Sequence, residues 1–241
     1  YVLFYTPDNA FLIVAGEVEA EEVLALAKET YGKIPARAEP PRRNRAKEPP
    51  HRAHRLVSLS DEKVEQPAHE RVFLVPSYKT AAPGEAEALE TLAHMLGGGA
   101  TSALYESLVV EEKFAVGAGA YYLGSAVDDT RLWVYATPAP GVSLEELDRA
   151  IDRVIQRFVS EPIDEAHLAR ARTRLVADAI YAKDSQASLA RWYGEALATG
   201  LTIEDVAAWP ERMEAVTAAD VTAVARKWLD KRRSVTGFLL P

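Results

Sequence analysis

The sequence predicts an α+β fold, with a mainly antiparallel sheet and helices packed on one face. Three observations lead to this prediction. Residues 115–122 and 130–137 have strand character and are joined by a turn at 126–129, which is typical of an antiparallel hairpin. Residues 143–229 are almost entirely of helical periodicity, so the helices are grouped and do not alternate with strands. A last apolar run, at 235–240, predicts a closing strand.

The beginning of the chain has a different character from the rest. Residues 11–15 are apolar, follow a turn and predict a buried strand. Residues 19–31 have apolar side chains at helical spacing and acids in the first turn, so they predict a helix that stops at Gly32. Proline and basic residues then dominate 36–53, which predicts an extended linker.

These observations divide the chain into three parts. We expect residues 1–35 to be the terminal strand and helix of a preceding domain, 36–53 to be the linker, and 54–241 to be the main domain. The chain opens on strand-like residues, with no initiator methionine and no signal peptide, so we expect it to be a piece of a longer protein.

The main domain is predicted to contain the following elements in order: strands at 55–59 and 70–75, helices at 83–96 and 101–112, the hairpin, helices at 143–158, 164–181, 184–199, 203–209 and 217–229, and the closing strand. Ser143 and Thr217 each begin a capping box, and Pro210 is expected to interrupt the helix that begins at 203. Three consecutive glycines between the first two helices predict a tight turn, after which Thr101 or Ser102 caps the next helix.

Composition excludes several classes of function. The formal net charge of −8 argues against a nucleic-acid partner, which usually requires a basic face. The absence of cysteine excludes disulfides and thiolate metal sites, and it is compatible with either the periplasm or the cytoplasm. No apolar run approaches the roughly 18 residues that a membrane span requires.

Motifs for catalysis or metal binding are also missing. The sequence has no Gly-x-Ser-x-Gly, no phosphate loop and no dinucleotide fingerprint. His51 and His54 are close together but lack a third ligand, so we expect them to be exposed and incidental; His94 is expected to be a half-buried packing residue and His167 a surface residue. We therefore predict no catalytic residue and no metal ligand in this chain.

The aromatic residues of the hairpin allow two interpretations. Tyr121-Tyr122 and Trp133-Val-Tyr135 are expected to place one residue of each pair in the core. An aromatic binding platform is the less favoured alternative.

Two groups of segments resemble a known family. The first is Tyr5-Thr-Pro-Asp-Asn-Ala-Phe-Leu-Ile-Val-Ala-Gly-Glu-Val18 followed by Tyr31-Gly-Lys-Ile-Pro35; the second is Leu96-Gly-Gly-Gly99 followed by Ser102-Ala-Leu-Tyr105. In this order and spacing they resemble the pitrilysin-type zinc metallopeptidases, a family that includes insulinase and the mitochondrial processing peptidase. The resemblance covers essentially the whole chain.

The resemblance implies a clamshell of two halves, each built from two similar α+β domains. The active domain of such enzymes carries His-x-x-Glu-His, in which the histidines bind zinc and the glutamate activates water. This motif does not occur here. The chain therefore resembles the second, non-catalytic domain of a half, with zinc expected in the missing upstream domain, of which residues 1–35 would be the end.

A second family signature concerns substrate binding by the opposing half. Its pattern, Leu-Arg-x-x-x-Gly-Leu-Ala-Tyr, provides an Arg and a Tyr that hold substrate carbonyls. Laid on Leu108, the pattern places Val109 at the Arg position and Val116 at the Tyr position. Neither valine has a side-chain donor, so we expect this domain not to complete an active site.

The resemblance thus implies a bacterial-type domain that lines a peptide chamber, pairs with a partner half or subunit as a dimer, and presents Gly97, Gly98 and Gly99 to a peptide or unfolded polypeptide. The isolated chain is expected to have no hydrolytic activity. The alternative is a non-enzymatic structural or partner subunit of the same fold, which a search for His-x-x-Glu-His upstream would distinguish. An unrelated helical adaptor would require the hairpin to be absent.

Overall fold

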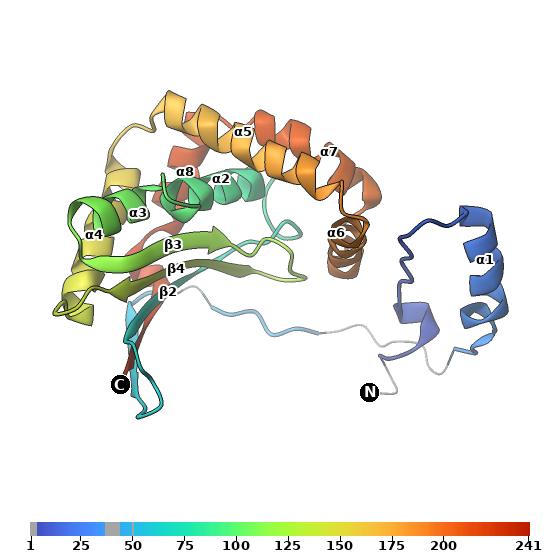
Figure 1. Ribbon diagram of the computed structural model, residues 1–241, viewed down its shortest axis with the longest axis horizontal. Coiled ribbons are helices and arrows are strands. Elements are labelled where there is room, and N and C mark those ends of the chain that lie inside the picture. Colours follow the sequence, from blue (N-terminus) through green and yellow to red (C-terminus); the bar gives the residue numbers. More distant parts are fainter. Residues whose placement is uncertain (1–3, 37–43, 50) are drawn as a thin grey trace. The chain divides into compact units, whose positions relative to one another are not determined.

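A five-stranded mixed sheet with the order β1-β5-β2-β4-β3 organises the computed structural model (Figure 1). The structure describes residues 4–36, 44–49 and 51–241. The strands are β1 (Arg55–Ser60), β2 (Ala68–Val75), β3 (Ala115–Tyr122), β4 (Thr130–Pro138) and β5 (Ser234–Leu240). Only the β1–β5 pair is parallel among these strands, and β3 and β4 form the predicted antiparallel hairpin. The mainly antiparallel sheet is confirmed, and the hairpin excludes the helical adaptor.

The described helices complete the α+β fold. They are α1 (Ala20–Glu29), α2 (Glu85–Gly97), α3 (Ala103–Tyr105), α4 (Leu144–Ser160), α5 (Glu165–Ala182), α6 (Gln186–Thr199), α7 (Ile203–Glu214) and α8 (Ala218–Trp228). Short 3-10 turns are η1 (Pro7–Asn9), η2 (Tyr31–Lys33) and η4 (Lys231–Arg233), and η3 (Glu106–Glu111) is wound as a π-helix. No helix in the described part of the chain is long and apolar enough to cross a membrane.

Contacts divide the described residues into two compact units. One unit combines those up to Pro49 with Ile180–Val206, and the other combines those from His51 to Ala179 with Ala207–Pro241. The second unit contains the sheet and the hydrophobic core.

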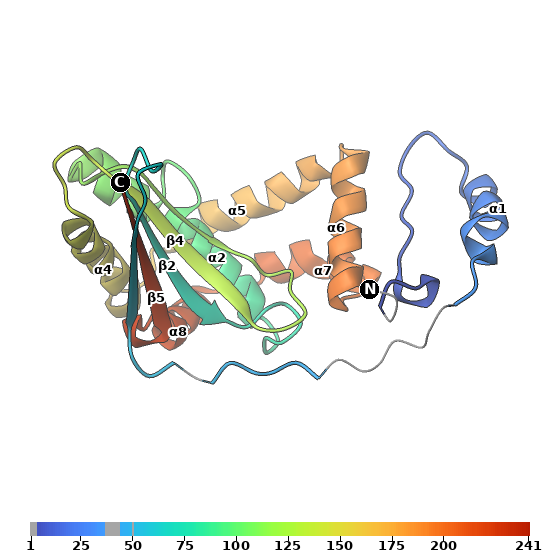
Figure 2. The same ribbon diagram turned by 90° about the horizontal axis from the view of Figure 1, so that it is seen from below.

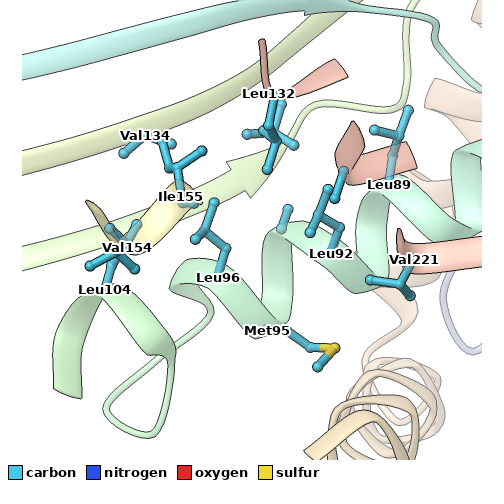
Figure 3. Close-up of a cluster of buried hydrophobic side chains, with 14 of the residues drawn as sticks. Leu89, Leu92, Met95, Leu96, Leu104, Leu132, Val134, Val154, Ile155 and Val221 are labelled. Carbon is cyan, nitrogen blue, oxygen red and sulfur yellow. The ribbon is translucent and has the colours of Figure 1, made fainter. Parts of the chain in front are cut away.

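The core lies between one face of the sheet and the helices α2, α4 and α8 (Figure 2). Leu92 and Leu96 of α2 point toward Leu132 and Val134 of β4, and all four side chains are fully buried (Figure 3). This packing follows from the periodicities of the elements, because a strand turns alternate residues to one face and a helix turns residues three or four apart. The packing of helices on one face of the sheet was therefore predictable from the sequence.

Both predicted capping boxes are present. Ser143 accepts a hydrogen bond from the backbone N–H of Glu146, whose carboxylate accepts from the N–H of Ser143. Thr217 and Asp220 make the same exchange at the start of α8. These boxes fix where α4 and α8 begin, because each satisfies backbone donors that the first turn leaves unpaired.

The predicted strand at 11–15 is wrong. These residues are exposed and belong to none of the described strands, and Phe11 keeps 62% of its surface exposed. A strand is stabilised by ladder hydrogen bonds to a neighbour, and no described strand pairs with this segment. The helix expected at 19–31 is present as α1. The strand-like opening falls partly on residues 1–3, and the linker partly on 37–43 and 50, which lie outside the described residues.

The single helix expected at 101–112 is replaced by α3 and the π-helix η3. The backbone N–H of Glu112 donates to the carbonyl of Ser107, five residues earlier, at 2.9 Å. Ser102 occupies the predicted cap position but makes no cap hydrogen bond; its hydroxyl donates back to the carbonyl of Gly99 at 2.6 Å. Wide π winding of this kind is often found at functional sites.

Pro210 does not interrupt its helix, contrary to the prediction. α7 continues through it to Glu214. Residues on both sides hold the helix in place: Trp209 donates from Nε1 to the hydroxyl of Tyr78 at 2.7 Å, and Met213 is fully buried. These tertiary contacts offset the cost of about 3 kcal/mol that a proline imposes within a helix.

Candidate functional site

The glycine turn between α2 and α3 divides into a packing residue and two exposed residues. Gly97 is buried, and a Cβ added there would lie 1.8 Å from the backbone nitrogen of Ala120 on β3. Gly98 and Gly99 are exposed, and Gly99 has a φ of +126°, which favours glycine. Gly97 thus allows the helix to touch the strand, and only Gly98 and Gly99 remain available to a ligand.

The segment after this turn has an unusual backbone conformation and valine at the two positions where the family pattern expects donor side chains. Val109 is partly buried against the core, and Val116 is exposed beside an irregularity in the β3–β4 pairing. Between them, Lys113 has a φ of +56°; the pattern laid on Leu108 would place its Gly at this residue. A non-glycine residue pays roughly 1–2 kcal/mol for this left-handed conformation. The segment therefore combines a left-handed turn at Lys113 with valine at both expected donor positions.

An acid-lined hollow of about 210 Å³ lies beside the π-helix. Glu106 and Glu111 line it from η3, and Glu161, Asp164 and His167 line it from the segment around the start of α5. His167 lines this hollow and is half-buried. Burial, followed by the charge of Arg170, lowers the pKa of His167.

The remaining predicted histidines are dispersed. His54 is half-buried and not exposed as expected, and its Nε2 lies 2.9 Å from the hydroxyl of Thr236 on β5. His51 is also half-buried. His94 is half-buried as predicted, and burial lowers its pKa. Within the described residues, no group of three or more His, Asp or Glu side chains could hold a metal ion.

Sequence reasoning missed a group of ionisable side chains between the sheet and α4, in which His69 and Arg71 are buried and the others are partly exposed. We call it the ionic cluster: His69, Arg71, Asp148, Asp152 and Lys231. Arg71 is 1% exposed and binds both aspartates of α4, while Lys231 of η4 binds the same two. His69 Nε2 lies 2.7 Å from Asp148 Oδ1. The cluster joins β2, α4 and η4 within one unit.

The electrostatics of this cluster favour ionised aspartate. Burial opposes ionisation of Asp148, but the hydrogen bond from His69, the charge of Arg71 and the hydrogen bond from Lys231 outweigh it and hold its pKa well below the usual range. A sequence signal existed: His69-x-Arg71 on one strand face, and Asp148 and Asp152 four residues apart on a helix. The pairing itself joins residues 79 positions apart and could not be read from spacing.

A second unpredicted cluster links α7 to α2. The Tyr78 hydroxyl donates to the carboxylate of Glu90 and accepts from Trp209 Nε1. Burial is the main cause that raises the pKa of both Glu90 and Tyr78. This hydrogen-bonded chain helps to hold α7 in place and brings no reactive group to the glycine turn.

The aromatic residues of the hairpin divide between the two faces of the sheet. Tyr122 points to the core and Tyr121 away from it, as expected. Trp133 and Tyr135 share the outer face, because residues two apart in a strand point the same way, so the expectation that one of them enters the core is wrong. The rings of Tyr121 and Trp133 lie 4.9 Å apart in an edge-to-face arrangement.

Comparisons with known proteins identify relatives of this chain. A sequence profile described as the peptidase M16 inactive domain matches residues 1–175. The zinc protease PqqE of Helicobacter pylori is 24% identical over 242 residues, with 99% of this chain and 53% of that protein covered, so the chain spans about half the length of that relative.

Solved structures share the fold. A protease from Helicobacter pylori superposes with a TM-score of 0.88 at 23% identity and covers 100% of this chain and 57% of its own. A peptidase M16 inactive domain from Pseudomonas fluorescens gives 0.78 at 14% identity, with 94% and 52% covered. A putative zinc protease from Bordetella pertussis Tohama I gives 0.64 at 19% identity, with 73% and 95% covered.

Proposed function

Because this chain belongs to the peptidase M16 family, as an inactive domain, we propose that it serves as the non-catalytic domain of a zinc endopeptidase. In this role it forms part of the wall of the substrate chamber and pairs with a partner half or subunit. The substrate is a peptide or unfolded polypeptide. Zinc is held by the preceding domain of the parent protein, and residues 1–35 are the last part of that domain.

The observation that carries this proposal is the segment from Val109 to Val116. It combines a π-helix, a left-handed turn at Lys113 and a strand, with valine at the two positions where donors would hold a substrate carbonyl. The donor set of the described residues does not fit a zinc ion, so we assign no catalytic step to this chain. A domain of this kind contributes part of the wall of the substrate chamber and the surface that contacts the partner.

The exposed residues Gly98, Gly99 and Ala100 support the placement of substrate. They follow the end of α2, and the acidic hollow is bounded by Met95 and Ala103, which flank the turn. Glycines without side chains let a passing backbone approach closely.

Activity measurements test the non-catalytic role. The purified chain, with and without added zinc, should not cleave a fluorogenic peptide library. Addition of the separate zinc-bearing domain, together with the partner half, should give cleavage that depends on this chain. Zinc-dependent cleavage by the chain alone contradicts the proposal, and a complex that forms without cleavage supports the alternative of a structural partner subunit.

A single-cysteine probe tests the substrate-facing turn, because the chain has no cysteine of its own. Ala100→Cys carries a photo-crosslinker beside Gly99, and Val127→Cys carries the same group at an exposed position of the β3–β4 turn. In the assembled enzyme, we expect a peptide to crosslink at position 100 and not at 127. Equal crosslinking at the two positions contradicts this placement.

A further inference from the structure

Within the part of the chain that the structure describes, the outer strand β1 has little protection against pairing with another strand. All six of its residues are exposed, including Val57 and Leu59 at 59% and 60%, and among the described elements it makes extensive contacts only with β5. It contains no proline, and its single charged residue is Arg55. Soluble proteins normally shield such edges with charges, prolines, bulges or a covering loop.

Backbone geometry shows which residues of β1 are open to a partner. The N–H of Asp61, which follows the strand, donates to the carbonyl of Leu240 on β5 at 3.1 Å. Because successive residues of a strand direct their N–H and C=O groups to opposite sides, the odd-numbered residues of β1 face β5. The backbone groups of Leu56, Ser58 and Ser60 therefore point to the free edge.

We propose that β1 pairs with β1 of a second copy of this chain, antiparallel and centred on Ser58, to join the two sheets into one. This register places Ser58 opposite Ser58, and Leu56 opposite Ser60 of the second copy, so that every outward-facing residue has a partner. Each of these pairs exchanges two backbone hydrogen bonds. A shift by two residues in either direction leaves part of the strand unpaired.

The same register is complementary in its side chains. Val57 lies opposite Leu59 of the second copy, and the symmetry repeats this apolar contact on the same face of the joined sheet. One position further out, Arg55 lies opposite Asp61 of the second copy, which gives two symmetry-related pairs of opposite charge. The sequence Arg-Leu-Val-Ser-Leu-Ser-Asp over 55–61 is thus self-complementary about its centre.

The interface is small, so we expect a reversible dimer. A pair of seven-residue segments buries less than the roughly 1,600 Å² of a standard interface. Sedimentation equilibrium of the whole chain over about 1 to 300 µM should show a transition from monomer to dimer. A chain that stays monomeric throughout this range overturns the proposal.

Charge reversal tests the register. Arg55→Glu places Glu opposite Asp61, and Asp61→Lys places Lys opposite Arg55, so each variant alone should associate about tenfold more weakly than the unmodified chain. A mixture of the two variants restores both pairs of opposite charge and should dimerise again as a heterodimer. If each variant associates as strongly as the unmodified chain, or if the mixture remains monomeric, the register is wrong.

Disulfide formation provides a test that does not depend on those charges or on the turn hydrogen bond that Asp61 makes to Lys63. Ser58 is the only residue of β1 that faces its own counterpart, so Ser58→Cys should form a crosslinked dimer under mild oxidation. Ser60→Cys is the matched control, because position 60 faces Leu56. Equal crosslinking of the two variants contradicts the pairing.

The dimer is separate from the proposed peptidase role, and an active enzyme with a monomeric chain would overturn only the dimer.

Discussion

Gly97 sets the distance between a helix and a strand by the absence of a side chain. It is the last residue of α2, and its Cα faces the backbone of Gly119 and Ala120 on β3. The sequence identified a turn at the three glycines, which is a local property of the chain. The close approach to β3 was not predictable, because it joins segments more than twenty residues apart that only the folded sheet brings together.

Replacement of Gly97 by alanine should therefore destabilise the fold. The added methyl group would overlap backbone atoms of β3, which cannot rotate away as a flexible side chain could, so we expect Gly97→Ala to lower the free energy of unfolding by about 3 kcal/mol. Gly117→Ala is the control, because a Cβ at that position of β3 meets no atom within 4 Å. Urea denaturation measures both, and equal losses would show that close packing at Gly97 is not the cause.

At the scale of elements, the sheet and α4 are joined by charge as well as by apolar packing. Leu147, Ile151 and Val154 of α4 enter the core, which the amphipathic pattern of 143–158 predicted. The ionic cluster lies beside them, where Arg71 on β2 is shielded from water and paired with carboxylates of α4. Periodicity places such residues on a face, and only the tertiary structure selects their partners.

The ionic cluster should be sensitive to the loss of one partner. Arg71→Met removes the fully buried cation and leaves Asp148 and Asp152 paired only with the partly exposed Lys231, so we expect a loss of about 3 kcal/mol in the free energy of unfolding. Arg232→Met is the control: this arginine is 75% exposed in its pair with Asp230, and such surface pairs contribute at most about 1 kcal/mol. Chemical denaturation of both variants measures the two free energies of unfolding. A similar loss in Arg71→Met and Arg232→Met would contradict the predicted importance of the ionic cluster.

Across the whole molecule, three half-buried histidines connect stability to pH. Burial is the main cause that lowers the pKa values of His54, His94 and His167 below the ordinary value of 6.5. The unfolded chain then binds protons more readily than the folded chain, so these residues contribute stability above about pH 6.5 that is lost as the pH falls. Glu90 acts in the opposite direction, because its raised pKa favours the fold only while its carboxyl is protonated.

We expect His94→Gln to reduce the loss of stability between about pH 7.5 and pH 5.5, because glutamine does not titrate. Thermal denaturation of the variant and the unmodified chain across this range measures the difference in slope. His51→Gln is the control, because it makes the same chemical change at another half-buried histidine. A slope unchanged in His94→Gln would show that this histidine does not contribute.

The fold class, the hairpin and both capping boxes were predictable because each depends on residues close together in the sequence. The predictions failed where a distant contact decided the outcome. Pro210 is tolerated within α7 because Trp209 reaches Tyr78, 131 residues away. Residues 11–15 have the composition of a strand, but composition alone provides no hydrogen-bonding neighbour. In the candidate site, the family pattern assigned the positions of Val109 and Val116. The π-helix that contains Val109 was not predicted.

The position of β5 between β1 and β2 also bears on how the chain emerges from the ribosome. Arg55 pairs with Val235, so β1 leaves the ribosome about 180 residues before the strand that completes it. At roughly 5–20 residues per second, this delay is on the order of ten seconds or more. During translation, the apolar strand β1 has no partner within its own chain, and a chaperone that binds extended apolar segments would find it in that interval.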